Sequence, residues 1–98
     1  MDITYKTKKL KKICNNYTAA RKEYNSNMAD KIHQRIDNIT AAPNVEMLIS
    51  CKIGRCHTLK GDRAGQYAMD LVHPYRLVFT VKGEAIQIAN IVEIADYH

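Results

Sequence analysis

The apolar residues of this chain change their spacing at about Gly54, and this change constrains the fold more than any other feature. Before Gly54, apolar residues recur every three or four positions, which is typical of amphipathic helices. After Gly54, apolar and polar residues alternate, which is typical of half-buried strands. Helices followed by consecutive strands predict an α+β fold, with two or three N-terminal helices packed on one face of a small antiparallel sheet.

The first residues predict a short strand that leads into a helix. Ile3 and Tyr5 alternate with polar neighbours, and Thr7 is a suitable N-terminal cap for a following helix. The apolar stripe of that helix would consist of Leu10, Ile13, Cys14 and Tyr17. The pattern leaves open whether Asn15-Asn16 ends this helix or whether the stripe continues through residues 17–24.

A second helix is predicted before Pro43. Asn27 and Asp30 resemble a capping box in which Asp replaces the usual Glu. The apolar face of this helix would consist of Met28, Ile32, Ile36 and Ile39. Pro43 ends the helix because proline lacks the backbone N–H that a helix needs. Residues 45–49 suit one further helical turn.

The second half of the chain predicts an antiparallel meander. Turn-forming residues occur at 60–63, 73–74 and 82–84, and the runs between them alternate. The apolar residues of the first two strands are Tyr67, Met69, Leu71, Tyr75, Leu77, Phe79 and Val81. We expect one face of the last strand to carry Ile86, Ile88, Val92 and Ile94. The helices would cover one face of the sheet, and the face that carries Arg76 would be free to meet a ligand.

The length of 98 residues fits a single domain that spans residues 1–98. No apolar run approaches the roughly 18–20 residues that cross a bilayer, and no signal-peptide core follows Met1. Three cysteines are too few for a disulfide framework, which favours a reducing compartment. We therefore expect a cytoplasmic protein with no membrane partner.

The net charge of +5 arises entirely from the first part of the chain. Residues 1–40 contain nine Lys and Arg against four acidic residues, whereas residues 41–98 contain six of each. Such a basic segment indicates either an anionic partner, such as nucleic acid, or a solvated helix face that keeps the protein soluble. Charge alone does not decide between these two interpretations.

Several common catalytic motifs are missing from the sequence. Cys51, Cys56 and His57 do not have a usual zinc spacing, and no second pair of ligands completes a site. The four glycines match no phosphate-binding loop, and the two serines lack a nucleophile elbow. We therefore expect the protein to use neither a metal nor a cofactor.

The remaining candidate residues suit the cleavage of RNA by its own 2′-hydroxyl group. That reaction needs a base for the 2′ proton, an acid for the leaving 5′ oxygen, and cations for the phosphate. Histidine serves either proton role near neutral pH, whereas arginine and lysine bind phosphate. A tyrosine is also able to stack on an unpaired base. The candidates are His57, Lys60, Arg76, Asp96, Tyr97 and His98.

Three motifs in the second half resemble the HigB branch of the RelE/ParE toxin superfamily. They are the run HTLKGDRAGQY at residues 57–67, the run Tyr75-Arg76-Leu77-x-Phe79, and the terminal Asp96-Tyr97-His98. The first half is similar to this branch only in length and basic character. The departures from the family pattern are Thr58, Tyr75 and Ala95, where proline, tryptophan and an acidic residue are common.

This resemblance implies a toxin of a type II toxin–antitoxin pair that cleaves mRNA on the ribosome without a metal. It implies that His57, Lys60, Arg76, Asp96, Tyr97 and His98 serve catalysis or substrate placement. We expect His57 and His98 to share the proton transfers, in an order that the match does not settle. Asp96 would orient or assist one of them, and Arg76 with Lys60 would stabilise the phosphorane. Contacts with RNA phosphates are expected from Lys8, Lys9, Lys11, Lys12 and Arg63.

The resemblance also implies partners. The cognate antitoxin would be a small HigA-like helix-turn-helix protein that inhibits the toxin and binds operator DNA, so that the toxin meets DNA only through it. The ribosome and its mRNA would be the other partners. The alternative is a ParE-like toxin that poisons DNA gyrase without cutting RNA, and a third possibility is an inactive binding module.

Overall fold

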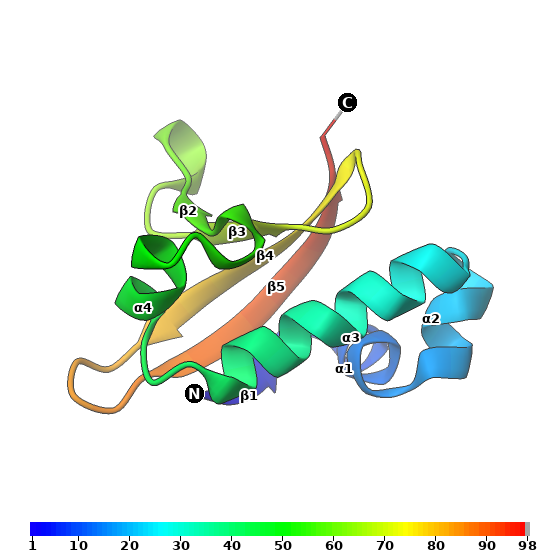
Figure 1. The fold of residues 1–98 in the computed structure, drawn as a ribbon, viewed down its shortest axis with the longest axis horizontal. Helices are drawn as coiled ribbons and strands as arrows, with labels where there is room; N and C mark the ends of the chain where they lie inside the picture. Colours follow the sequence, from blue (N-terminus) through cyan, green and yellow to red (C-terminus); the bar gives the residue numbers. More distant parts are fainter. Residues whose placement is uncertain (98) are drawn as a thin grey trace.

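One five-stranded sheet and a layer of helices make up residues 1–97, which are the residues that the computed structural model describes; His98 lies outside them (Figure 1). The strands are β1 (Asp2–Tyr5), β2 (His57–Thr58), β3 (Tyr67–Asp70), β4 (Tyr75–Lys82) and β5 (Ile88–Asp96). Their order across the sheet is β1-β5-β4-β3-β2. All neighbours are antiparallel except β1 and β5, which are parallel. The predicted α+β class is confirmed.

The helices of the described chain are α1 (Lys8–Asn15), α2 (Tyr17–Glu23), α3 (Ser26–Ala41) and α4 (Val45–Ser50). Thr7 caps α1, as predicted, because its side chain accepts a hydrogen bond from the N–H of Leu10 at 3.1 Å. Asn16 then ends α1 and caps α2 by accepting from the N–H of Ala19 at 3.1 Å. The first stripe therefore ends at Asn16. None of the helices in residues 1–97 is long and apolar enough to cross a bilayer.

The long helix α3 begins earlier than predicted. The side chain of Asn25, rather than that of Asn27, accepts the N–H of Met28 at 2.9 Å and caps the helix. Asn27 lies inside the helix, so the capping-box prediction was wrong by two positions. The two asparagines have the same capping chemistry, and residue type alone did not distinguish them. The end of α3 before Pro43 and the further turn in α4 are both confirmed.

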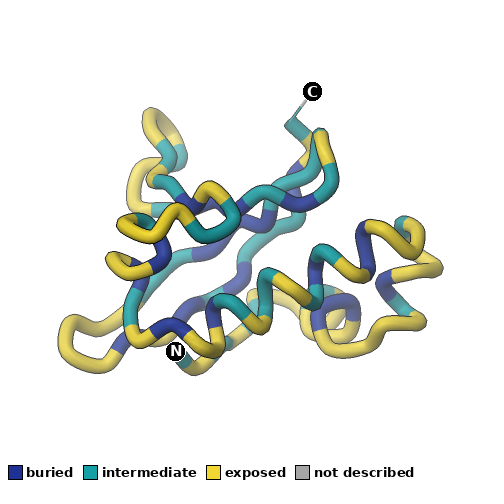
Figure 2. The backbone as a smooth tube through the Cα atoms, in the orientation of Figure 1, coloured by how far each residue is buried: buried dark blue, intermediate teal, exposed yellow. Residues whose placement is uncertain are grey.

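The main apolar core lies between the helices and one face of the sheet, as predicted (Figure 2). Its largest side chains, each no more than 1% exposed, are Met28, Ile32, Ile39, Leu48, Met69, Leu77, Phe79 and Ile91. Full burial of one such side chain stabilises a fold by roughly 1.5–3 kcal/mol. The fold is therefore held together mainly from the helical side of the sheet.

A β-bulge in β5 changes which residues face this core. Phe79 pairs with Ile91 and Val78 pairs with Glu93, so Val92 is an extra residue on β5. As a result, Ile91 and Ile94 pack in the main core, whereas Val92 packs on the opposite face. The prediction that Ile86, Ile88, Val92 and Ile94 share one face was wrong, because the alternation stops at the bulge. Ile86 is 82% exposed and lies before the strand.

The opposite face of the sheet is partly covered. Ala68, Val78 and Ala95 are buried there in a second, smaller cluster. The residues that pack against this cluster are Leu59, Val92 and Tyr97. We expected this face to be free to meet a ligand. The segment after β2 and the chain end cover its middle, whereas Arg76 at one end is partly accessible and Lys82 and Ile88 at the other end are exposed.

Candidate functional site

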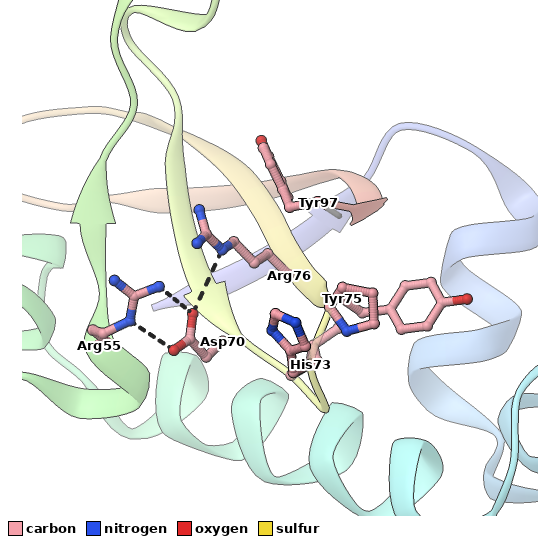
Figure 3. Close-up of a pocket in the computed structure, with 8 residues that line it drawn as sticks. Arg55, Asp70, His73, Tyr75, Arg76 and Tyr97 are labelled. Atoms are coloured by element: carbon pink, nitrogen blue, oxygen red, sulfur yellow. Dashed lines mark hydrogen bonds and ion pairs between the residues drawn. The ribbon is translucent and has the colours of Figure 1, made fainter.

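The candidate functional site lies beside Arg76, at the end of the sheet where β3 and β4 are joined (Figure 3). A small hollow of about 80 Å³ is lined by Arg55, Asp70, Leu71, His73, Pro74, Tyr75, Arg76 and Tyr97. This volume is well below the roughly 300–1,000 Å³ of pockets that hold drug-sized ligands. The hollow therefore fits a small charged group, such as a phosphate, rather than a whole nucleotide.

Arg76 forms one wall of this hollow. It comes from β4, whose alternation points it away from the core residues Leu77 and Phe79. Its Nε lies 3.7 Å from Oδ1 of Asp70, and its Cζ lies 4.7 Å from the centre of the Tyr97 ring. The first contact is an ion pair and the second is a cation–π interaction. The guanidinium is thus held from two sides.

Tyr97 is itself fixed by three contacts. Its hydroxyl accepts a hydrogen bond from Nη1 of Arg63 at 3.1 Å, and its backbone N–H donates to the carbonyl of Pro74 at 3.0 Å. Its ring lies against Arg76. Nη2 of Arg63 forms an ion pair with Glu93. Arg63, which we expected to contact RNA, therefore uses its guanidinium inside the protein to hold Tyr97.

Arg55 and Asp70 form an ion pair that the sequence analysis did not identify. Nε and Nη2 of Arg55 donate to the two carboxylate oxygens of Asp70 at 2.7 and 3.0 Å (Figure 3). These hydrogen bonds lower the pKa of Asp70, and the positive charges of Arg55, Arg76 and His57 lower it further, against a smaller opposing effect of burial. Asp70 is therefore a carboxylate at neutral pH.

An unusual turn before β2 positions Arg55. Lys52, Gly54 and Arg55 have φ values of 54°, 58° and 53°, in the left-handed region that non-glycine residues rarely occupy. A Cβ on Gly54 would lie 2.7 Å from Nε of Arg35. That same Nε donates to the backbone carbonyl of Asp70 at 2.7 Å. Glycine at position 54 therefore lets Arg35 of α3 reach the end of β3.

His57 lies on the same face of the sheet as Arg76. It pairs with Ala68, two residues before Asp70, and Asp70 pairs with Arg76. Nδ1 of His57 lies 2.8 Å from the backbone carbonyl of Arg55. Because a carbonyl only accepts hydrogen bonds, Nδ1 carries the hydrogen, and in the neutral ring Nε2 has the lone pair that a base needs.

The other expected catalytic residues do not all lie near Arg76. Lys60 is exposed and precedes the 3₁₀ turn Gly61–Arg63, whose last residue contacts Tyr97. Asp96 pairs with Tyr75, so its side chain lies on the opposite face from Arg76 and Tyr97. His98 lies outside the described residues. The structure thus places His57, Arg76 and Tyr97 on one face of the sheet, with Arg76 and Tyr97 in contact, and it places Asp96 on the other face.

The expected RNA-binding lysines lie in the other layer. They are Lys8, Lys9, Lys11 and Lys12, all exposed on α1. Lys9 forms an ion pair with Glu23 of α2 at 2.8 Å. Because α1 packs on the helical side of the sheet, these lysines form a surface separate from the hollow around Arg76.

The buried cysteines are not reactive groups. Burial raises the pKa of the Cys14 thiol to about 12 and that of the Cys56 thiol to about 11. Both thiols are therefore protonated at neutral pH, and a protonated thiol is a poor nucleophile. Their role is to pack in the apolar core.

The fold resembles that of known toxins. No known protein-family model and no curated protein match the sequence. Among solved structures, the YoeB/ParE toxin from Agrobacterium tumefaciens matches over 100% of both chains, with a TM-score of 0.67 and 20% identity. YoeB in the YoeB–YefM complex from Staphylococcus aureus matches over 100% of this chain and 97% of that one, with a TM-score of 0.62 and 24% identity.

The YoeB dimer from Staphylococcus aureus also matches over 100% of this chain and 97% of its own, with a TM-score of 0.63 and 22% identity. At these identities the likeness establishes the fold and no more. The expected RelE-like arrangement of helices and sheet is confirmed for the fold.

Proposed function

We propose that this chain is the toxin of a type II toxin–antitoxin pair and that it cleaves mRNA on the ribosome. The observation that carries this proposal is the placement of His57, Arg76 and Tyr97 on one face of the sheet, where Arg76 and Tyr97 line a phosphate-sized hollow. The fold, which the chain shares with toxins, supports it. The assignment to the HigB branch rests on the motifs at residues 57–67, 75–79 and 96–98.

In the proposed mechanism, Nε2 of His57 takes the proton from the 2′-hydroxyl. The 2′ oxygen attacks the phosphorus, the bond from phosphorus to the 5′ oxygen breaks, and an acid protonates that leaving oxygen. The products are a 2′,3′-cyclic phosphate and a 5′-hydroxyl end, so water is not the nucleophile, and the groups named supply the acid, base and positive charge that the step needs. We assign the acid to His98. The carbonyl of Arg55 supports His57 as the base, since it fixes the hydrogen on Nδ1.

Arg76 and Lys60 stabilise the charge that develops on the phosphate. Arg76 is already held by Asp70 and Tyr97, so little reorganisation is needed when the phosphate arrives. Tyr97 serves this mechanism by holding Arg76 and by offering its ring to an unpaired base. Asp96 faces away from Arg76, and we limit its role to the chain end, where it orients His98.

The partners follow from the same proposal. The exposed lysines of α1 rest on ribosomal RNA through salt-sensitive phosphate contacts, while the hollow around Arg76 receives the mRNA. The antitoxin is a HigA-like helix-turn-helix protein that inhibits the toxin and binds operator DNA. A toxin that acts on translating ribosomes works in the cytoplasm.

Translation in a cell-free extract tests this proposal. Added protein should produce mRNA cuts that depend on ribosomes and end in a 2′,3′-cyclic phosphate, and His57→Ala or His98→Ala should abolish them. The His98→Ala variant should also remain folded and lose growth inhibition in cells. Inhibition of DNA supercoiling without mRNA cleavage would instead support a ParE-like gyrase poison, and neither effect would support an inactive binding module.

A further inference from the structure

We propose that Asp70 is a positioning residue, which orients the guanidinium of Arg76 toward the scissile phosphate. This inference rests on the proposed function, because it assigns Arg76 to the phosphate. Nothing in the resemblance to toxins points to Asp70, and the sequence analysis gave it no role. Contacts from two arginines converge on its carboxylate.

Two guanidinium groups flank this carboxylate. Arg55 donates two hydrogen bonds to it, and Nε of Arg76 faces its Oδ1 from the other side (Figure 3). Two cations this close repel each other unless an anion lies between them. Without Asp70, Arg76 would turn away from Arg55 and leave its place beside the hollow.

The position of Asp70 is itself well determined. It pairs with Arg76 at the end of β3, and its backbone carbonyl accepts a hydrogen bond from Arg35 of α3 at 2.7 Å. The strand end is therefore fixed by a contact that does not involve the carboxylate. A substitution of the Asp70 side chain would keep this anchor and remove only the charge.

The geometry of Arg76 explains why orientation matters. Its Nε is turned toward Asp70 and its flat face lies against Tyr97. Its ion pair with Asp70 uses Nε, whereas its two Nη groups are the ones that form parallel hydrogen bonds with a phosphate. Asp70 thus acts through the Nε side and leaves the phosphate-binding edge available.

Arg55 links this arrangement to the proposed base. Its side chain binds Asp70, and its backbone carbonyl accepts from Nδ1 of His57. The left-handed φ of 53° at Arg55 is costly for a non-glycine residue, and the ion pair with Asp70 helps to hold it. One ion pair therefore positions both the phosphate-binding cation and the base.

The variant Asp70→Asn separates this proposal from a simple effect of charge. If Asp70 only places a negative charge near the phosphate, its removal should improve both ribosome association and cleavage. If Asp70 positions Arg76, single-turnover cleavage should fall by roughly 10–100-fold, while association measured by co-sedimentation should stay the same or become tighter. The matched control is Asp37→Asn, an exposed aspartate of α3 on the helical layer, which should leave cleavage unchanged.

A second measurement needs no RNA. The Nε–H resonance of Arg76 in a ¹⁵N–¹H spectrum, assigned by its loss in Arg76→Lys, reports how far this side chain is restricted. It should be ordered in the wild-type protein, become mobile in Asp70→Asn, and stay ordered in Asp37→Asn. Melting temperatures should show that both variants remain folded, because an exposed ion pair is worth about 0–1 kcal/mol.

Each result has a definite meaning. Unchanged or faster cleavage by Asp70→Asn, or an unchanged Arg76 resonance in that variant, would overturn the positioning role. A wild-type protein that cuts no mRNA would contradict the proposed function instead, and the Arg76 resonance would then decide alone whether Asp70 orients this side chain.

Discussion

The two faces of the sheet are built from the same strands, but different interactions stabilise the side chains on each face. On the helical face, Leu77 and Phe79 of β4 are fully buried in an apolar core. On the other face, Arg76 of the same strand lies among charged groups and an aromatic ring. Alternate residues of one strand therefore serve stability and the proposed chemistry separately. Substitutions on the two faces should change different measured quantities.

The largest effect is expected on the helical face. Phe79→Ala should lower the free energy of unfolding by about 3–5 kcal/mol, because it leaves a cavity in the core. Denaturation in urea measures this loss. Phe79→Leu keeps most of the volume, should cost less, and serves as the measurable variant where Phe79→Ala does not fold. A small loss of unfolding free energy in Phe79→Ala would show that the stability of the core does not depend on the Phe79 side chain.

On the opposite face, Arg76→Ala should reduce activity strongly and stability by no more than about 1 kcal/mol. We expect single-turnover cleavage to fall by about 10²–10³-fold, or 2.7–4 kcal/mol, which is the typical cost of losing one group that stabilises an oxyanion. Ribosome association should change less than cleavage. The control is Lys82→Ala, which removes a cation from the same face of β4 about 20 Å away. Equal losses in both variants would mean that only net charge matters.

A smaller effect should follow from Tyr97→Phe. This variant removes the hydroxyl that accepts from Arg63 but keeps the ring against Arg76. The lost hydrogen bond should cost about 1 kcal/mol of stability, and cleavage should fall only slightly. Tyr97→Ala, which also removes the ring, should reduce cleavage much further. Similar cleavage rates for the two variants would argue against a role for the ring.

The smallest effect concerns pH. The pKa of Asp70 is lower in the folded protein than in the unfolded chain, where an aspartate titrates near about 3.9. Its ion pairs therefore stabilise the fold above about pH 4, and this contribution disappears as the pH falls through the lowered pKa. The difference in unfolding free energy between wild type and Asp70→Asn should be small at pH 7 and should shrink as the pH falls below about 4. A difference that grows on acidification would contradict this pairing.

Sequence patterns predicted the local features of this protein well. They predicted less well the features that depend on contacts between distant residues. The α+β class, the cap at Thr7 and the end of α3 before Pro43 all depend on neighbouring residues, and all are confirmed. The bulge at Val92 was missed because a strict alternation gives no sign of an extra residue. The cap at Asn25 was missed because Asn27 has the same chemistry.

The candidate site shows the same difference between local patterns and distant contacts. His57, Arg76 and Tyr97 were identified by residue type and motif, and they do lie on one face. The ion pair of Arg55 with Asp70 was missed because it depends on left-handed backbone at Lys52, Gly54 and Arg55. One signal was available, since a hairpin centred on residue 73 places Asp70 opposite Arg76.

The extra residue Val92 has a consequence for the end of the chain. Because it shifts the alternation of β5 by one position, Tyr97 shares a face with Arg76, and Asp96 turns to the helical side. If Val92 instead took a regular place in the alternation, the carboxylate of Asp96 would stand where the aromatic ring now covers the guanidinium. Deleting the valine itself would keep the pair Val78–Glu93 and leave Tyr97 beside Arg76, because every later residue of β5 would hold its place.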